Sequence, residues 1–169
     1  MATETAQTET EQADVTIREA RVEDCDGIAA ILHALGWFEH INRQPVAQTQ
    51  VQIAARIARC QIEKTHTILV AESKPHGVVG YVAVHWFPNL AFGHDGYVSE
   101  LFLHPAMTDR GIGGRLLDAV SEYARKRGCT RLTLMNRRTR ESYQRGFYAK
   151  HGWHEVSDAA FFTLPLPRG

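Results

Sequence analysis

The sequence of 169 residues has no excess of charge of either sign and no long apolar run. Its 19 Lys and Arg residues balance its 19 Asp and Glu residues, so it lacks the positive field that nucleic-acid binders and membrane-surface proteins usually carry. A stretch of about 18 apolar residues, which a membrane-spanning helix needs, is missing, as is the basic-then-apolar layout of a secretory signal. We therefore expect a cytoplasmic protein that binds neither nucleic acid nor a membrane.

Cysteine is also scarce, with three residues and no CxxC spacing among them. This pattern favours reduced thiols over a disulfide framework or a zinc site. His151 and His154 lie three positions apart, but Gly152 between them is expected to end a helix, so the two rings need not converge. The sequence predicts no metal site. The three cysteines are Cys25, Cys60 and Cys129.

Large apolar side chains are absent from residues 1–13 after Met1, and this segment is polar and acidic. Such a composition cannot repay the entropy of ordering, so we predict a disordered tail. The chain as a whole is 44% hydrophobic and long enough to bury one ordinary core. We predict a single domain over residues 14–169.

Along that domain, apolar residues recur with strand and helix spacings in turn, which predicts a mixed α/β (α+β) fold. The helix expected at 111–127 is marked at both ends, by glycines before it and by Gly128 after it. The segment KPHG predicts a hairpin turn. Strands are expected at 15–20, 66–73, 78–87, 97–105, 130–135, 153–156 and 161–166. Helices are expected at 21–35, 45–64, 111–127 and 139–151, and a loop at 88–96.

Three glycines, Gly111, Gly113 and Gly114, stand within four positions between an expected strand and an expected helix. Unpaired N–H groups at the positive end of a helix dipole favour an anion, and glycine lets phosphate oxygens approach the backbone. A P-loop needs Lys and then Ser or Thr after the last glycine, where Arg115 and Leu116 stand instead. A dinucleotide fingerprint needs glycine at position 116. The alternative is a glycine turn that only starts a helix.

The surrounding stretch, ELFLHPAMTDRGIGGRLL, closely resembles the acetyl-CoA motif of the GNAT superfamily of N-acetyltransferases. In that family, a strand reading LFV and a loop reading Q/R-x-x-G-x-G/A bind the pantetheine arm and the pyrophosphate. Thr108 stands where the family usually has Gln or Arg, and Arg110 lies close enough to substitute. A second segment, FYAKHGW at 147–153, is similar to the family's FYEKLGF. The resemblance implies cofactor binding by Leu101, Phe102, Leu103, Thr108, Asp109, Arg110, Gly111, Ile112, Gly113, Gly114 and Arg115.

The resemblance covers about residues 16–163 and implies the GNAT fold, a mixed, mostly antiparallel central sheet of six to seven strands flanked by about four helices. It also implies acetyl-CoA as co-substrate and no metal. The final segment FFTLPL is an apolar strand of the kind that often pairs across a dimer in this family, which suggests a homodimer.

Acetyl transfer from a thioester to an amine requires a neutral amine, stabilisation of an oxyanion and a proton for the departing thiolate. The resemblance implies direct attack by the amine, with the fourth and fifth strands splaying apart so that a free strand N–H within residues 101–103 can meet the thioester carbonyl. Tyr148 matches the tyrosine that many family members use to protonate the sulfur; the alternative is an aromatic core residue. Glu100 is the candidate base; the alternative is an exposed carboxylate that only attracts a cationic substrate. Ser99 occupies the neighbouring position, where other members place their carboxylate.

His85 and Trp86, at the end of the strand 78–87, are candidates for substrate binding, although a half-buried strand aromatic explains Trp86 equally well. The resemblance places Arg137, Arg138 or Arg140 near the adenosine 3′-phosphate; the alternative is a solvated loop. The predicted function is acetyl transfer to a primary amine of a small molecule. The alternatives are acetylation of a protein N-terminus or lysine side chain, and an inactive acyl-CoA-binding sensor.

Overall fold

The computed structural model describes residues 15–166. The chain divides into two compact units, Met1–Met135 and Asn136–Gly169, which we describe separately. The predicted disordered tail at 1–13 lies outside the described residues, and the single domain over 14–169 stays a prediction.

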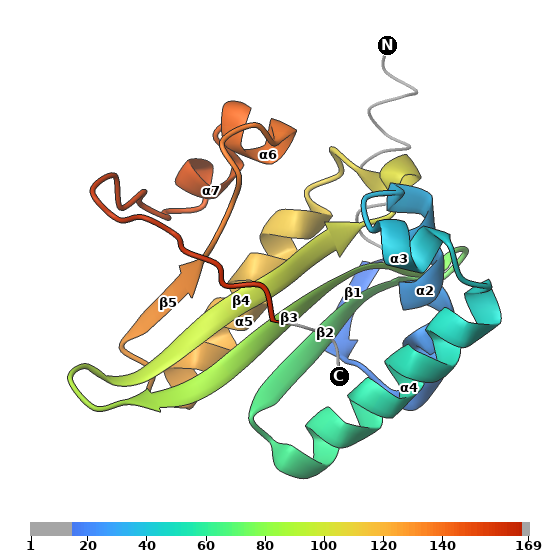
Figure 1. Ribbon diagram of the computed structural model, residues 1–169, viewed down its shortest axis with the longest axis horizontal. Helices are drawn as coiled ribbons and strands as arrows, with labels where there is room; N and C mark the ends of the chain where they lie inside the picture. Colours follow the sequence, from blue (N-terminus) through green and yellow to red (C-terminus); the bar gives the residue numbers. More distant parts are fainter. Residues whose placement is uncertain (1–14, 167–169) are drawn as a thin grey trace. The chain divides into compact units, whose positions relative to one another are not determined.

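The first unit is built on one five-stranded sheet with the strand order β1-β2-β3-β4-β5 (Figure 1). Neighbouring strands pair antiparallel from β1 to β4, and β4 pairs with β5 in parallel. The predicted mixed, mostly antiparallel sheet is therefore confirmed. The strands are β1 (Val15–Glu19), β2 (His66–Ser73), β3 (Gly77–Asn89), β4 (Gly93–Leu103) and β5 (Arg131–Leu134).

Helices cover both faces of this sheet (Figure 1). On one face, α2 and α4 enclose a core that also takes in Val70 and Tyr81 from the sheet. On the other face lies α5, whose Leu116, Leu117 and Val120 are fully buried. No helix within residues 15–166 is both long and apolar enough to span a bilayer. The helical segments of this unit are η1 (Val22–Asp24), α2 (Cys25–Leu35), α3 (Glu39–Asn42), α4 (Val46–Glu63), η2 (Pro105–Met107) and α5 (Ile112–Lys126).

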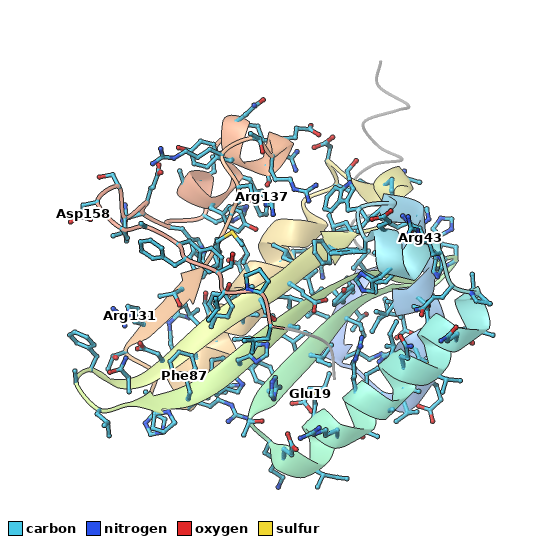
Figure 2. The ribbon with its side chains drawn as sticks, viewed as in Figure 1. Glu19, Arg43, Phe87, Arg131, Arg137 and Asp158 are labelled. Atoms are coloured by element: carbon cyan, nitrogen blue, oxygen red, sulfur yellow. The ribbon has the colours of Figure 1, made fainter. Side chains whose placement is uncertain are left out.

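The hairpin between β3 and β4 is longer than the sequence indicated, since pairing runs through Pro88 to Asn89↔Gly93. The predicted loop at 88–96 is therefore wrong except at its tip. Proline lacks the N–H that a central strand needs, but β2 pairs with β3 only as far as His85. Pro88 thus lies where β3 has a partner on one side alone. Phe87, on this projecting hairpin, is labelled in Figure 2 and is exposed.

The second unit contains two short helices, α6 (Glu141–Gln144) and α7 (Phe147–Lys150), where the sequence predicted one helix at 139–151. Gly146 separates them with a φ of 66°, a left-handed conformation that an α-helix cannot include. The backbone conformation of Gly146 itself therefore separates α6 from α7.

The two final strands predicted at 153–156 and 161–166 do not form within the described residues. The side chains of Phe161 and Phe162 are 64% and 88% exposed. Apolar residues adopt a strand only where a neighbouring strand and a core stabilise it. The sheet accordingly has five strands rather than six to seven.

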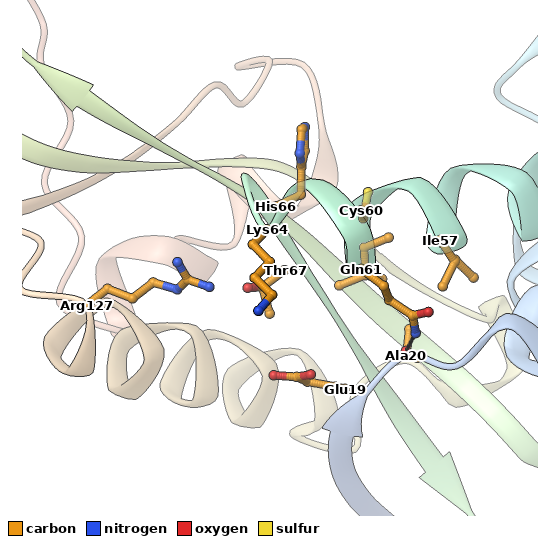
Figure 3. Close-up of a pocket in the computed structure, with 10 residues that line it drawn as sticks. Glu19, Ala20, Ile57, Cys60, Gln61, Lys64, His66, Thr67 and Arg127 are labelled. Atoms are coloured by element: carbon orange, nitrogen blue, oxygen red, sulfur yellow. Dashed lines mark hydrogen bonds between the residues drawn. The ribbon is translucent and has the colours of Figure 1, made fainter.

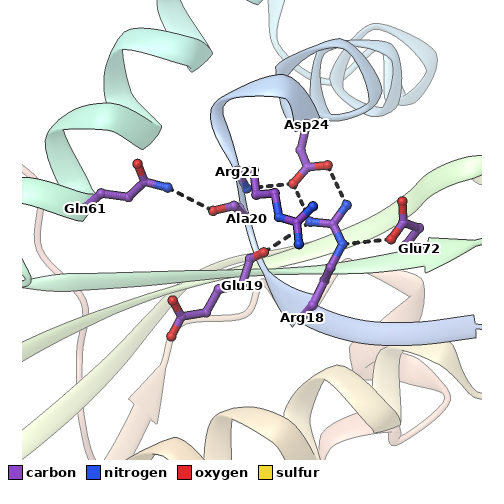
Figure 4. A network of polar contacts seen from close by, with 7 residues as sticks. All are labelled: Arg18, Glu19, Ala20, Arg21, Asp24, Gln61 and Glu72. Atoms are coloured by element: carbon purple, nitrogen blue, oxygen red, sulfur yellow. Dashed lines mark hydrogen bonds and ion pairs between the residues drawn. The ribbon is translucent and has the colours of Figure 1, made fainter.

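An ion-pair network joins β1 to the first helical turn and to β2 (Figure 4). Arg18 donates to both carboxylate oxygens of Asp24, at 2.7 and 2.8 Å, and to Glu72 at 2.7 Å. Asp24 also accepts from the Arg21 backbone N–H. Burial alone would raise the pKa of Asp24, but the hydrogen bonds from Arg18 and Arg21 outweigh it and hold this pKa below its ordinary 3.8.

We predict that Asp24→Asn lowers the free energy of unfolding by about 2 kcal/mol, because the Asp24 side chain is only 8% exposed and its loss leaves Arg18 half-paired. A carboxyl group whose pKa is lower in the folded state than in the unfolded state stabilises the fold when the pH is above the unfolded-state pKa. This contribution is lost as the pH falls through the folded-state pKa. Between about pH 5 and pH 3, the wild type should therefore lose more stability than the variant. Urea unfolding measures both effects.

Glu39→Gln, in an exposed pair with Arg43, serves as the control and should leave stability nearly unchanged. Equal stability of Asp24→Asn and the wild type at neutral pH would contradict this account of the network.

Candidate active site

The chain turns sharply between the end of β4 and the start of α5. His104 caps η2 by accepting from the Ala106 N–H, and Thr108 donates to the Pro105 carbonyl. Asp109 and Gly111 then adopt left-handed φ angles of 62° and 71°. Gly111 takes this conformation without a steric penalty, which allows α5 to begin at the very next residue.

The N-terminus of α5 presents backbone donors that no carbonyl of the helix accepts from. The first intrahelical bond runs from Arg115 N to Gly111 O, at 3.2 Å. The N–H groups of Ile112, Gly113 and Gly114 precede it and have no carbonyl partner within the helix. The first turn carries no acidic residue that would compete for them. The positive end of the helix dipole therefore favours an anion here.

One edge of β4 is unpaired beyond its midpoint. The parallel ladder with β5 ends at Val98↔Leu134, whereas β4 continues to Leu103. Opposite β3, the register passes from Val84↔Val98 to Ala83↔Glu100, so Ser99 is an extra, bulged residue. The separation of the fourth and fifth strands that the sequence resemblance implied is thus present within the described residues. It leaves the edge of residues 99–103 without a β-strand partner.

Glu100 lies on the α2 and α4 face of β4, beside a buried tyrosine. The Tyr81 hydroxyl donates to Glu100 Oε2 at 2.5 Å. Burial, and then the charge of Glu100, raise the pKa of Tyr81 well above 10, so the phenol stays protonated. Sequence reasoning missed Tyr81, because only the strand register shows that it reaches Glu100.

Aromatic side chains flank this carboxylate. Phe102, two residues along the same face, makes edge contacts with Tyr81, Phe38 and Trp37 at ring-centre distances of 5.8, 5.6 and 5.7 Å. Trp37 keeps 48% of its surface exposed. Trp37 and Phe38 belong to the segment GWFEHINRQP that follows α2, which the family resemblance gives as one of the stretches that usually shape the acceptor site.

His85 and Trp86 point to opposite faces of β3, as neighbours in a strand must. His85 Nε2 lies 2.9 Å from Ser99 Oγ, on the same side of the sheet as Glu100. Burial, and then the neighbouring His66, lower the pKa of His85, so its ring is neutral at pH 7. Trp86 is buried on the α5 side and donates to Thr67 Oγ1 at 2.8 Å. The structure therefore brings His85 together with Ser99 and Glu100 but not Trp86.

Tyr148 lies on α7 in the second unit. Its ring contacts Phe147 and Trp153, with centres 5.0 and 6.2 Å away. Burial raises the pKa of the phenol above 10, so Tyr148 holds a proton at pH 7. Arg138, one of the expected phosphate contacts, pairs with Glu155 at 2.7 Å.

No group of three or more His, Cys, Asp or Glu side chains within residues 15–166 is arranged to hold a metal ion. Two sets of backbone groups described above could bind a cofactor, namely the N–H donors of α5 and the edge of β4 that lacks a strand partner within residues 15–166. This combination can receive an extended molecule with an anionic portion.

Comparison with known proteins identifies the family of this chain. The profile of the acetyltransferase (GNAT) family matches residues 32–153. A thialysine N-epsilon-acetyltransferase from Bos taurus is 27% identical over 157 residues, covering 84% of this chain and 91% of the relative. A solved transcriptional regulator from Bacillus halodurans C-125 has a TM-score of 0.70 at 24% identity, over 89% of this chain and 99% of that one.

Glucosamine-6-phosphate N-acetyltransferase from Arabidopsis thaliana gives a TM-score of 0.69 at 15% identity, over 89% of this chain and 99% of that chain. At such low identity the two solved structures share the fold alone. The family profile, however, matches well over half of the sequence. The chain therefore belongs to the GNAT family of acetyltransferases.

Proposed function

We propose that the protein is an acetyl-CoA-dependent N-acetyltransferase whose acceptor is the primary amine of a small molecule. The observation that carries the proposal is the unpaired β4 edge followed directly by the open N-terminus of α5. The pyrophosphate of the carrier would take the N–H groups of residues 112–114. Its pantetheine arm would then lie along residues 101–103 and bring the thioester toward Glu100.

In the proposed reaction, the amine nitrogen attacks the thioester carbonyl directly. A backbone N–H within residues 101–103 stabilises the oxyanion. Glu100 accepts the proton that the amine loses, and Tyr148 gives its proton to the sulfur as the carbon–sulfur bond breaks. The neutral state of the Tyr148 phenol at pH 7 supports this role.

The surroundings of Glu100 support a small cationic acceptor. Its carboxylate is held by Tyr81 and lies on one face with Phe102. The exposed ring of Trp37 stands against Phe102, and aromatic faces attract ammonium groups. The name of the bovine relative specifies acetylation of thialysine, which is a small amine. A homodimer and a cytoplasmic location remain predictions.

The proposal is tested by coenzyme A release over a panel of amines that includes lysine analogues and peptides. Release with small amines but not with peptides is the expected result. Tight binding of acetyl-CoA with no release for any acceptor would instead identify an acyl-CoA sensor. Failure to bind acetyl-CoA at all would overturn the proposal.

Gly113→Asp should weaken acetyl-CoA binding about 100-fold, because it places a carboxylate where the pyrophosphate is expected. Gly113→Asn is the matched variant, of equal size but without charge, and should bind more tightly than the aspartate form. Calorimetry measures both affinities, and circular dichroism checks that both variants fold. Equal affinities for the wild type and a folded Gly113→Asp would exclude this pyrophosphate site.

Tyr148→Phe should lower kcat about 100-fold while the KM for acetyl-CoA stays within about twofold, since the change removes only the proton donor. Tyr143→Phe is the control, because its hydroxyl bonds to Glu155 and has no assigned part in the reaction. Steady-state coenzyme A release gives both constants. Equal kcat values for the two variants would remove Tyr148 from the mechanism.

Glu100→Gln should lower kcat/KM for the amine about 100-fold, with the loss largest at low pH, where more of the amine carries a proton. Tyr81→Phe keeps the carboxylate and should lose less than about tenfold. Rates measured from about pH 6 to 9 decide between the roles of Glu100. A rise in the KM for the amine at unchanged kcat would show that Glu100 attracts the substrate without serving as the base.

A further inference from the structure

A cavity of about 330 Å³ opens at the edge of the sheet, away from the site described above (Figure 3). It is lined from β1, α4, β2 and the residue that follows α5. Its volume falls at the lower end of the range for small-molecule sites. Glu100 belongs to β4, which lies two strands away from β2 in the sheet. The cavity is therefore separate from the proposed acetyl-transfer site.

The cavity exists because β1 is shorter than β2 at this edge. β2 begins at His66, but its ladder with β1 starts only at Leu69, opposite Glu19. The two helices that flank this step end beside it, α4 at Glu63 and α5 at Lys126. No element of the described first unit therefore fills the step.

Charges of both signs line this cavity without neutralising one another. Lys64 and Arg127, the residues that directly follow α4 and α5, extend into it (Figure 3). Glu19 lines it as well, with one carboxylate oxygen fixed by the Tyr123 hydroxyl at 2.9 Å. Within residues 15–166, neither Lys64 nor Arg127 forms an ion pair with a carboxylate. Opposite charges that share a cavity but remain more than 4 Å apart leave room for a ligand between them.

The walls of the cavity are held in place by contacts that need no ligand. The Arg127 guanidinium lies 5.1 Å from the centre of the Trp86 ring, which orients it. Thr67 Oγ1 accepts from the Trp86 indole, and Gln61 donates to the Ala20 carbonyl. A preorganised wall reduces the entropy that a small ligand must lose on binding.

We propose that this cavity binds a small zwitterion, namely a free α-amino acid. Its carboxylate lies between Lys64 and Arg127, and its ammonium group faces Glu19. A simple carboxylate would be repelled by Glu19, and a simple amine would be repelled by the two cations. Only a ligand with both charges satisfies all three groups. Ile57 and Ile68 supply apolar wall for an aliphatic side chain.

Three matched probes test the proposal on the full chain without acetyl-CoA: L-valine, isovalerate, which is valine without its amine, and isobutylamine, which is valine without its carboxylate. Amide shifts in a ¹⁵N-labelled sample are followed during titration. L-valine should shift the amides of Lys64, His66 and Arg127 and bind about tenfold more tightly than either single-charge probe. Unmoved amides at these residues, or equal affinity for all three probes, would overturn the proposal.

Variants assign the two ends of the ligand. Lys64→Gln should weaken L-valine and isovalerate alike by about tenfold, and Arg127→Gln serves in its place if Lys64→Gln does not fold. Glu19→Gln should abolish the preference for L-valine over isovalerate. Lys126→Gln, a neighbouring charge outside the cavity, is the control and should bind as the wild type does. Unchanged binding in both the lysine and glutamate variants would exclude this cavity as the site. Because binding is measured without a thioester, this outcome is independent of the proposed acetyl transfer.

Discussion

The partner of β4 changes at Ser99, and the candidate site depends on that change. Up to Val98, β4 is held between β3 and β5, so its backbone groups are used on both sides. At Ser99 the strand bulges, and beyond it β3 is the only strand among residues 15–166 that pairs with β4. The same strand then leads through η2 into α5, whose first N–H groups have no carbonyl partner within the helix. The edge of β4 without a β5 partner and the first N–H groups of α5 thus follow one another within a few residues. The proposed binding of an extended anionic acyl carrier depends on this arrangement.

The polar side chains near the edge of β4 are positioned by hydrogen bonds to neighbouring side chains. Tyr81 is buried and bonds to Glu100, and His85 is half-buried and bonds to Ser99. Both contacts run between β3 and β4, so the register of this one antiparallel pair sets the geometry of the proposed acceptor side. The second polar region of the first unit, around Lys64 and Arg127, depends instead on the ends of α4 and α5. The two regions therefore have separate structural origins.

The fold could be predicted where local signals and tertiary packing agree. The α5 helix has glycines at both ends and one apolar face, and it begins and ends within a residue or two of the expected bounds. The KPHG turn likewise joins two strands as expected. The single helix expected at 139–151 and the strands at 153–156 and 161–166 were wrong because periodicity cannot show a left-handed Gly146 or the absence of a pairing partner. For the site, Glu100 and the glycines stood out in the sequence. The contact of Tyr81 with Glu100 depends on the register of β3 and β4, and that of Trp37 with Phe102 depends on the path of the chain between α2 and α3, so neither could be predicted from the sequence.

In the proposed site, main-chain amides of α5 bind the pyrophosphate, and side chains are not required. A site of this kind requires little room and a correct backbone path, and it constrains the identity of few residues. Thr108, which replaces the usual Gln or Arg, is then tolerable. A main-chain site of this kind would tolerate wide sequence divergence around it, and this chain is 27% identical to the bovine relative. In this proposal, the acceptor amine contacts side chains around Glu100. Substitutions there could change the acceptor while the α5 amides continued to bind the same acyl carrier.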